Sequence, residues 1–473
     1  MNEKLSEAMD YISDAHIAEA AGAKKRHRKL WIGAAAAILV LVLLLNGPGM
    51  PPAVYAQTIS QASGSRQPQR PDRGDYETDS AYQTAWQDWS AQREQTKVQA
   101  DAALENLTPF FLETTRLYLS GSGGENRVWS PVNAYIALAM LSEITDGDSR
   151  QQILDALNTP DRDTLRTQAG AVWEEVYDND GNEICLLANS LWLNDGLSYE
   201  QEAMDNVAYY HYASVYQTDF SSPDAGKALR EWLDANTGGL LKDYIGTSDL
   251  SPEMVLSLAS TVYLQAKWVE GFNAANNTEE TFHAPGGDIT CTYMNKKGLL
   301  ADYYWGESYG AVALHLKNGT QMWLILPDSD KTPEDVLAEG EYLERILHQE
   351  RNTDDNSKYM QVNLSLPKFD ISSGADARAV FQSLGITDIF DLSRSDFTAI
   401  TSDSPVFITS VNQAARVIVD EQGIKAASYL EFPGDGAPMP PEEIMDFILD
   451  RPFLFVIADN GGTPLFTGLV NNP

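Results

Sequence analysis

The sequence predicts an α+β fold that follows an N-terminal transmembrane helix. From about residue 102 to the last residue, the chain is dense in apolar residues, as expected of one large folded region. Helical spacing dominates the first half of this region and strand-like runs dominate the second, which favours α+β over a repeating βαβ sheet. No repeat with a period of about 20–50 residues is visible, so the sequence gives no sign of a solenoid.

An apolar segment close to the N-terminus predicts the transmembrane helix. The basic run at residues 24–29 is followed by residues 30–45, which carry no charge, and we place a signal-anchor at residues 30–50. The positive-inside rule then keeps residues 1–29 in the cytoplasm and the rest outside. Cleavage after Ala56 by signal peptidase, and hence secretion, is the alternative.

The next segment, residues 51–101, is predicted to be a tether that is first disordered and then helical. Residues 57–75 are polar and rich in Gln, Ser, Arg and Pro, with no apolar period. Helical spacing begins at about residue 79, and Pro109 is expected to end or kink the helix.

The remaining residues, 102–473, form the predicted folded domain. Helices are expected at residues 131–141, 149–157 and 225–233. Strands are expected at residues 184–192, 255–263, 311–316, 321–326, 360–366, 406–409, 416–419 and 453–457.

Composition excludes several classes of function. The 473 residues include 33 Lys and Arg against 68 Asp and Glu, a net charge of −35, which argues against nucleic acid and against docking on anionic lipid by charge alone. Cys185 and Cys291 lie far apart and near no histidine pattern, so we expect two buried free thiols and no zinc site. HExxH, GxSxG and glycine-rich phosphate loops are absent, so the sequence predicts no metal, no cofactor and no enzyme.

A series of short blocks, in order along the chain, resembles one protein family. They are Asn126 with Trp129-Ser130-Pro131; Asn236-Thr237-Gly238-Gly239; Val262-Tyr263, Lys267-Trp268 and Phe272; Leu366-Pro367-Lys368-Phe369; Leu384-Gly385-Ile386; Asp396-Phe397; Arg451-Pro452-Phe453-Leu454-Phe455; Pro464-Leu465-Phe466-Thr467-Gly468; and Asn472-Pro473. Each block is weak alone, but together they span residues 102–473. The chain thus resembles the serpins, in a membrane-anchored form that suggests a bacterial cell surface.

The resemblance implies a serpin fold with three β-sheets, eight or nine helices and an exposed reactive-centre loop at about residues 421–441. In this family a target protease cleaves the loop and becomes acylated. The cleaved loop then enters the main sheet as an extra strand and traps the acyl-enzyme. The implied partner is a serine protease, the inhibitor is expected to be a monomer, and no catalytic residue is needed.

The start of the loop, called the hinge, is compatible with insertion. It comprises Glu421, Gly423, Ile424, Ala426, Ala427 and Ser428. If Ile424 faces the core, the strand period of two turns Ala426, Ser428 and Leu430 inward as well, and none of these is charged. Inhibitory serpins usually have Thr or Ser where this chain has the bulkier Ile424, so insertion is expected to be slower.

The sequence leaves the position of the scissile bond open. Sixteen residues after Glu421, the usual loop length, place it after Ala437, whereas counting back from Pro440-Pro441 places it after Pro438. Because proteases generally refuse proline after the cut, the bonds after Gly436 and before Met439 remain alternatives. Small residues here suit elastase-like or subtilisin-like proteases.

Two further groups of residues are expected to control the opening of the main sheet. Trp268 matches the family tryptophan at the point where the loop enters. Lower down, Ser130, Asn133, Ser260 and Gln413 occupy a polar cluster in which three residues differ from the family pattern. Because buried polar groups need partners, we expect a rebuilt hydrogen-bond network without the pH sensitivity of a histidine. The sequence therefore predicts an extracytoplasmic inhibitor, with a non-inhibitory binding module or an inhibitor of papain-like proteases as alternatives.

Overall fold

The structure is a computed structural model that describes residues 56–66, 71–179, 184–240, 250–348, 356–409, 411–424 and 443–473. All of these residues belong to one compact unit, Pro48–Pro473. The predicted cytoplasmic segment, the signal-anchor and loop residues 425–442 lie outside them. Among the helices of the described part, none is both long enough and apolar enough to cross a membrane.

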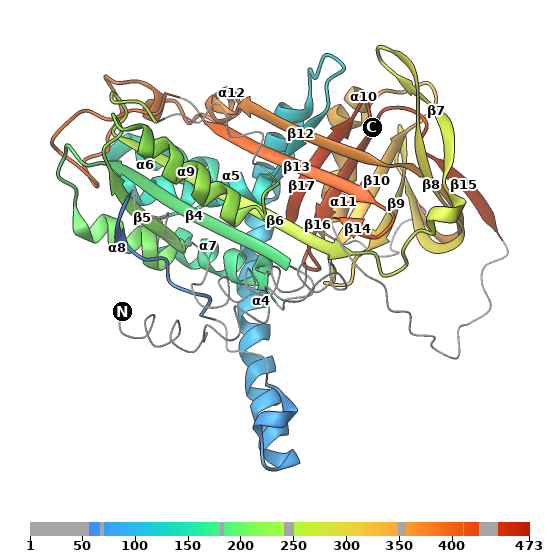
Figure 1. The fold of residues 1–473 in the computed structure, drawn as a ribbon, viewed down its shortest axis with the longest axis horizontal. Helices are drawn as coiled ribbons and strands as arrows, with labels where there is room; N and C mark the ends of the chain where they lie inside the picture. The colour runs from blue at the N-terminus through green and yellow to red at the C-terminus, as the bar shows by residue number, and fades with distance from the viewer. Residues whose placement is uncertain are drawn as a thin grey trace, which may run out of the picture. The chain divides into compact units, whose positions relative to one another are not determined.

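Nine α-helices lie within the described residues, in agreement with the eight or nine that the resemblance implies (Figure 1). They are α4 (Asp79–Leu119), α5 (Pro131–Ile144), α6 (Gly147–Ala156), α7 (Arg162–Val176), α8 (Gln201–Tyr210), α9 (Pro223–Asn236), α10 (Pro333–Glu339), α11 (Glu341–His348) and α12 (Arg378–Ser383). Short 3-10 turns are η1 (Arg73–Asp75), η3 (Ala274–Asn276) and η4 (Asp388–Phe390).

Helix α4 differs from its prediction at one point. It is a single helix of 41 residues that continues through Pro109, so this proline does not end it. Its buried residues all lie between Ala100 and Leu119, and its N-terminal half contributes none. Burial of the second half offsets the hydrogen bond that a proline removes inside a helix.

The first sheet has eight strands in the order β1-β5-β4-β6-β14-β13-β12, with β3 paired to β4. Their bounds are β1 (Gln57–Ser60), β3 (Asp178–Asn179), β4 (Ile184–Asn194), β5 (Ala213–Thr218), β6 (Leu256–Lys267), β12 (Phe369–Asp376), β13 (Asn412–Asp420) and β14 (Gly423–Ile424). Helix α9 packs on β4 and β6, which Figure 1 shows in front of the sheet. The opposite side of β4 and β6 lies against α5 and α7.

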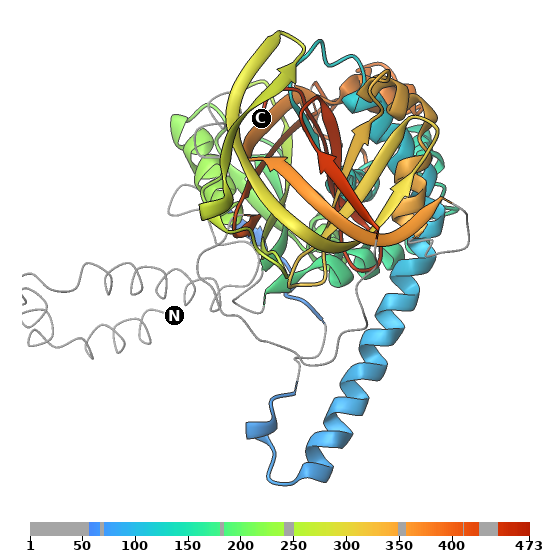
Figure 2. The same cartoon turned by 90° about the vertical axis from the view of Figure 1, so that its right-hand side faces the viewer.

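The second sheet has nine strands in the order β15-β11-β8-β9-β10-β16-β17-β2, with β7 paired to β8, and it curls strongly (Figure 2). Their bounds are β2 (Arg127–Trp129), β7 (Thr278–Ala284), β8 (Gly287–Trp305), β9 (Tyr309–His315), β10 (Gln321–Pro327), β11 (Ser357–Pro367), β15 (Ile444–Ile448), β16 (Phe453–Ala458) and β17 (Pro464–Val470). In the described part of the chain, two continuous sheets therefore stand where the resemblance implied three. The 19-residue strand β8 pairs with β7, β11 and β9 along its length and so joins two parts into one.

The segment 57–66 corrects the prediction of a disordered tether. Strand β1 pairs antiparallel with β5 at the edge of the first sheet, with Thr58 opposite Tyr216. The chain then follows α8, where the Ser63 N–H donates to the carbonyl of Ala208 at 3.2 Å. Polar side chains that bond to the domain, rather than an apolar pattern, fix this segment, which is why hydrophobic periodicity missed it. We call residues 57–66 the strap.

Both cysteines are free, as the sequence predicted. Cys185 in β4 is buried, and burial raises the pKa of its thiol. Cys291 in β8 is only half-buried, so the prediction of two buried thiols holds for one of them.

Candidate functional site

The hinge is the beginning of an added strand. After β13 the chain turns at residues 421–422 and returns as β14, in which Gly423 and Ile424 pair with β13 on one side and with β6 on the other. Ile424 lies opposite Val419 of β13 and Ala266 of β6. Over the residues that the structure describes, β6 and β13 are joined through β14 and show no pairing with each other.

Glycine is required at position 423 by a close approach of two backbones. Its φ of +151° is a conformation that other residues rarely adopt. A Cβ atom there would stand 2.2 Å from the carbonyl oxygen of Ala266 and 2.7 Å from the Cα of Lys267. A residue with a side chain could therefore not pair with β6 in this way.

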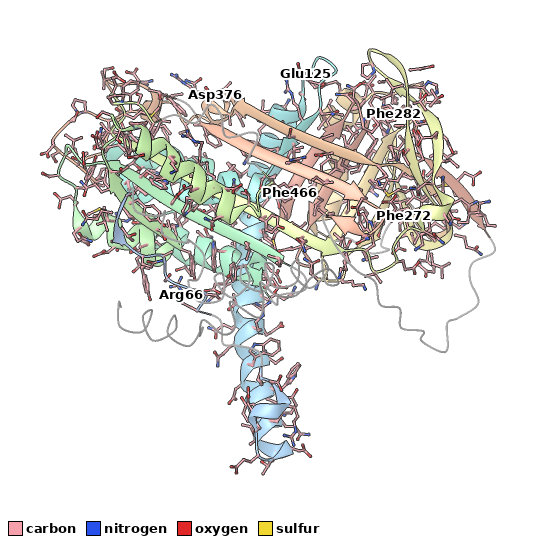
Figure 3. All side chains as sticks on the ribbon, in the orientation of Figure 1. Arg66, Glu125, Phe272, Phe282, Asp376 and Phe466 are labelled. Atoms are coloured by element: carbon pink, nitrogen blue, oxygen red, sulfur yellow. The ribbon has the colours of Figure 1, made fainter. Side chains whose placement is uncertain are left out.

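Ile424 points into the protein and borders a cavity. Its side chain is 4% exposed and belongs to the main hydrophobic core. The cavity lies between β6 and β13, and Figure 3 labels Phe466 beneath these strands. Its apolar lining includes Val262, Leu264, Ala415, Val417, Ile424 and Phe466. An apolar space thus lies where a longer strand between β6 and β13 would place its inward side chains.

An ion pair anchors the residue at which the hinge begins. The Nζ of Lys368 lies 2.9 Å from Oε2 of Glu421, and the Nδ2 of Asn277 donates to Oε1 of Glu421 at 2.6 Å. Burial raises the pKa of Glu421, but the hydrogen bonds from Lys368, the backbone and Asn277 outweigh it, so the pKa lies below its usual value. Lys368 sits between β11 and β12, where the chain passes from one sheet to the other.

Trp268 also holds the hinge, through hydrogen bonds as well as packing. Its indole N–H donates to the carbonyl of Asp420 at 2.9 Å, and its backbone N–H donates to the carbonyl of Gln422 at 3.0 Å. The backbone N–H of Phe272, labelled in Figure 3, donates to the carbonyl of Glu421 at 2.9 Å. Three consecutive carbonyls of the turn are therefore held from the segment that follows β6.

The polar cluster predicted below the hinge exists, but it forms two separate halves. On the β13 side, the Gln413 amide accepts from the Ser130 N–H at 2.9 Å and donates to the Ser130 carbonyl at 3.0 Å. On the β6 side, the Nδ2 of Asn133 donates to the Ser260 carbonyl at 2.9 Å, and the Ser260 hydroxyl bonds with Oδ1 of Asn133 or Asn189. Helix α5 connects the halves, because Ser130 caps it and Asn133 lies in its first turn.

Sequence reasoning missed three residues of this site. Lys368 lies in one of the family blocks, but the block does not indicate its role. No pattern in the sequence points to Asn277 or Asn189. No local pattern marks them, because each acts on a residue at least 53 positions away in the chain. Of the predicted residues, Ala426, Ala427, Ser428, Gly436, Ala437, Pro438 and Met439 lie outside the described residues.

The described residues around the hinge offer strand pairing and polar contacts. Within the described ranges, no group of three or more His, Cys, Asp or Glu side chains could hold a metal ion. The contacts of the site are instead backbone pairing, an ion pair and polar hydrogen bonds, which lie along the boundary between β6 and β13.

Comparison with known proteins identifies the family. The family model described as "Serpin (serine protease inhibitor)" matches residues 105–473. An uncharacterised serpin-like protein of Thermococcus kodakarensis is 30% identical over 370 residues, covering 76% of this chain and 84% of that protein. An alpha-1-antiproteinase of Callosciurus caniceps is 28% identical over 380 residues, covering 78% and 88%.

Solved structures show the same fold. The thermophilic serpin tengpin, in its native state, matches with a TM-score of 0.70 at 22% identity, over 89% of this chain and all of its own. A thyroxine-binding globulin complexed with thyroxine matches with a TM-score of 0.60 at 19% identity, over 80% and 99%. The family model and these relatives show that the chain belongs to the serpin family, whose members are generally serine protease inhibitors and not enzymes.

Proposed function

We propose that this serpin is a suicide-substrate inhibitor of serine-type endopeptidases that acts outside the cell membrane. The observation that carries the proposal is the hinge, where Gly423 and Ile424 already pair as the first two residues of a strand between β6 and β13. A small, largely apolar cavity borders Ile424 on the path that the following inward side chains would take.

The proposed reaction needs no catalytic group from the serpin. The protease serine hydroxyl attacks the carbonyl of the scissile bond, an ester forms, and the new amino terminus leaves with the hydroxyl proton. The freed loop then extends β14 and drags the attached protease away from its starting position. Hydrolysis of the ester stalls if this movement deforms the protease active site before water attacks.

The bond that is cut is proposed to lie at Ala437 or Pro438, with the neighbouring bonds at Gly436 and Met439 as alternatives. Small residues on this stretch support a target with a shallow specificity pocket, of the elastase or subtilisin kind. Trypsin-like proteases need a basic residue and are poor candidates.

The test incubates the full chain with elastase-, subtilisin-, trypsin- and papain-like proteases, followed by denaturing gels and mass spectrometry. A covalent species one protease heavier supports inhibition, and the mass of the released C-terminal peptide locates the bond. Cleavage without such a species across the whole panel would contradict inhibition and favour a binding module. A complex with the papain-like protease alone would move the target to the cysteine class.

A matched pair of variants tests the insertion register. Ala426→Arg places a charge on the inward side of the added strand, so we expect cleavage without a covalent complex. Ala427→Arg places the same charge on the outward side and should leave complex formation within about twofold, as for surface changes. Equal behaviour of the two variants would refute the register.

We further propose that residues 30–50 hold the inhibitor in the cell membrane with residues 1–29 in the cytoplasm. The basic run before an uncharged apolar segment supports this topology. Recovery of the full chain in a membrane fraction that resists alkaline extraction is the expected result. A soluble product that begins at Gln57 would instead show cleavage after Ala56.

A further inference from the structure

The strap makes specific contacts with the domain, although it lies outside residues 105–473, which the family model matches. Its first part forms β1 on the edge of β5, and the Ala62 N–H reaches the hydroxyl of Ser214 at 3.3 Å. Its Ser60 hydroxyl donates to Oδ1 of Asp205 in α8 at 2.7 Å.

Arg66 of the strap completes a partly buried network of polar side chains. Figure 3 labels Arg66, whose Nε donates to the Tyr212 hydroxyl at 2.7 Å, and this hydroxyl donates to Oε1 of Glu174 at 2.6 Å. The Arg66 backbone N–H donates to the same carboxylate at 2.6 Å, and the Ser65 hydroxyl donates to Oε2 at 2.5 Å. The guanidinium also stacks over the rings of Tyr209 and Tyr212, at 4.9 and 4.6 Å from their centroids.

The side chains that receive Arg66 are largely closed to solvent. Tyr212 is 1% exposed and stacks on Trp173 with a centroid separation of 3.8 Å. The side chain of Glu174 in α7 is 8% exposed. A buried carboxylate is costly unless it is paired and hydrogen-bonded, so departure of the strap would be unfavourable. The pocket therefore fits a peptide that carries a serine followed by an arginine.

The strap connects elements that must move apart when the sheet opens. To admit a strand, β6 must separate from β13. Strand β4 is hydrogen-bonded to β6 on one side and to β5 on the other, so these three strands form one block. This block would slide over the helices beneath it. The strap bonds β5 to α8 through Ser60 and Ser63 and to α7 through Glu174, and it thereby resists that sliding.

We propose that the strap is a ligand carried in cis for the edge of β5 and the Glu174–Tyr212 pocket, and that its binding slows insertion of the reactive loop. A peptide of the same pattern, an extended segment that contains Ser-Arg, is the class of ligand that the site takes in trans. The proposal rests on loop insertion, which is part of the proposed function, but not on trapping of a protease.

The experiment measures loop insertion in the absence of a target protease. Full-length chains are warmed, and conversion is followed by the growing resistance of residues 425–442 to a metalloprotease. Arg66→Ala should convert roughly tenfold faster, since charge-assisted hydrogen bonds to a buried carboxylate are lost, and deletion of residues 57–66 faster still. Arg73→Ala is the matched control, because Arg73 pairs with exposed Asp79.

A peptide added in trans completes the test. The sequence QTISQASGSR should slow conversion of the deletion variant towards the rate of the intact chain, and a scrambled peptide should not. Equal rates for the intact chain, Arg66→Ala and Arg73→Ala would overturn the proposal, as would a lack of conversion in every variant. If the chain traps no protease but its conversion still depends on the strap, the result would contradict the proposed function and leave this proposal standing.

Discussion

The hinge and the polar cluster below it lie along the same line between β6 and β13, yet they are held in different ways. At the hinge, two residues of β14 bridge the strands, and an ion pair and three carbonyl hydrogen bonds fix the turn. In the cluster, Gln413 bonds only within the β13 half and Ser260 only within the β6 half, among the contacts of the described residues.

If the reactive loop inserts as proposed, this difference predicts where the sheet resists opening. Because Ser130 and Asn133 lie in the same turn of α5, separating β6 from β13 at the cluster must break one of the two sets of hydrogen bonds. Extending β14 from the hinge, in contrast, keeps the anchor in place. We therefore expect the sheet to open from the hinge, and substitutions at Gly423, in the hinge anchor and in the cluster test this view.

Gly423→Ala should have the largest effect. The added Cβ would collide with the Ala266 carbonyl, so β14 must leave its place between the strands. We expect a loss of about 3 kcal/mol in the free energy of unfolding and cleavage of the loop without a covalent complex. Urea denaturation and gel analysis measure these two changes.

Gly286→Ala is the control for this change, because no atom lies within 4 Å of its Cβ position. It should leave both stability and complex formation nearly unchanged. If Gly423→Ala still forms the complex as efficiently as the intact chain, pairing at the hinge does not start insertion.

Breaking the hinge anchor should have an intermediate effect. Glu421→Gln and Lys368→Met are each expected to lower the free energy of unfolding by about 1–2 kcal/mol, reduced by the partial exposure of Lys368. A double-mutant cycle should give a coupling of about 1 kcal/mol. Additive losses would mean that the two side chains do not interact.

The same pair predicts a direction of pH dependence. Because the pKa of Glu421 in the folded protein lies below its ordinary value of 4.5, the pair stabilises the fold fully above that value. The stabilisation is lost as the pH falls through the lower, folded pKa. The intact chain should therefore lose more stability than Glu421→Gln over this range in acid titrations followed by fluorescence.

Ser260→Ala in the polar cluster should have the smallest effect. It removes one hydroxyl bond to Asn133 or Asn189 and should cost about 1 kcal/mol. Since Gln413 and Ser260 bond to different residues of α5, Gln413→Ala should add to it, with little coupling between the two sites in unfolding experiments. A coupling comparable to that of the hinge anchor would contradict the separation of the halves.

The sequence predicted the central strands and the buried helix well, because both are continuous apolar runs. Strand β4 spans Ile184–Asn194 where residues 184–192 were expected, and α5 spans Pro131–Ile144 where residues 131–141 were expected. The hinge could be placed by its resemblance to the family. Lys368 could not be assigned its role, because its partner lies 53 residues away and only the tertiary fold brings them together.

The strap shows the opposite case, because a segment predicted to be disordered is ordered against the domain. Residues 57–66 have a polar composition typical of disorder, but composition measures only the apolar surface that a segment can bury. The strap is stabilised by backbone pairing and by a charged group that completes a pocket on another part of the chain. Such a segment resembles a linker until the surface that binds it is known.

The position of β1 has a second consequence, for the behaviour of many molecules together. An uncovered edge strand presents a row of free N–H and C=O groups that can template pairing with another chain. Strand β1 pairs with β5 at one edge of the first sheet and so occupies the free backbone groups of β5. The edge that remains is only four residues long, and these residues are polar or half-buried. We therefore expect the strap to protect the protein from edge-to-edge aggregation, and a chain that has lost it to precipitate at lower concentration.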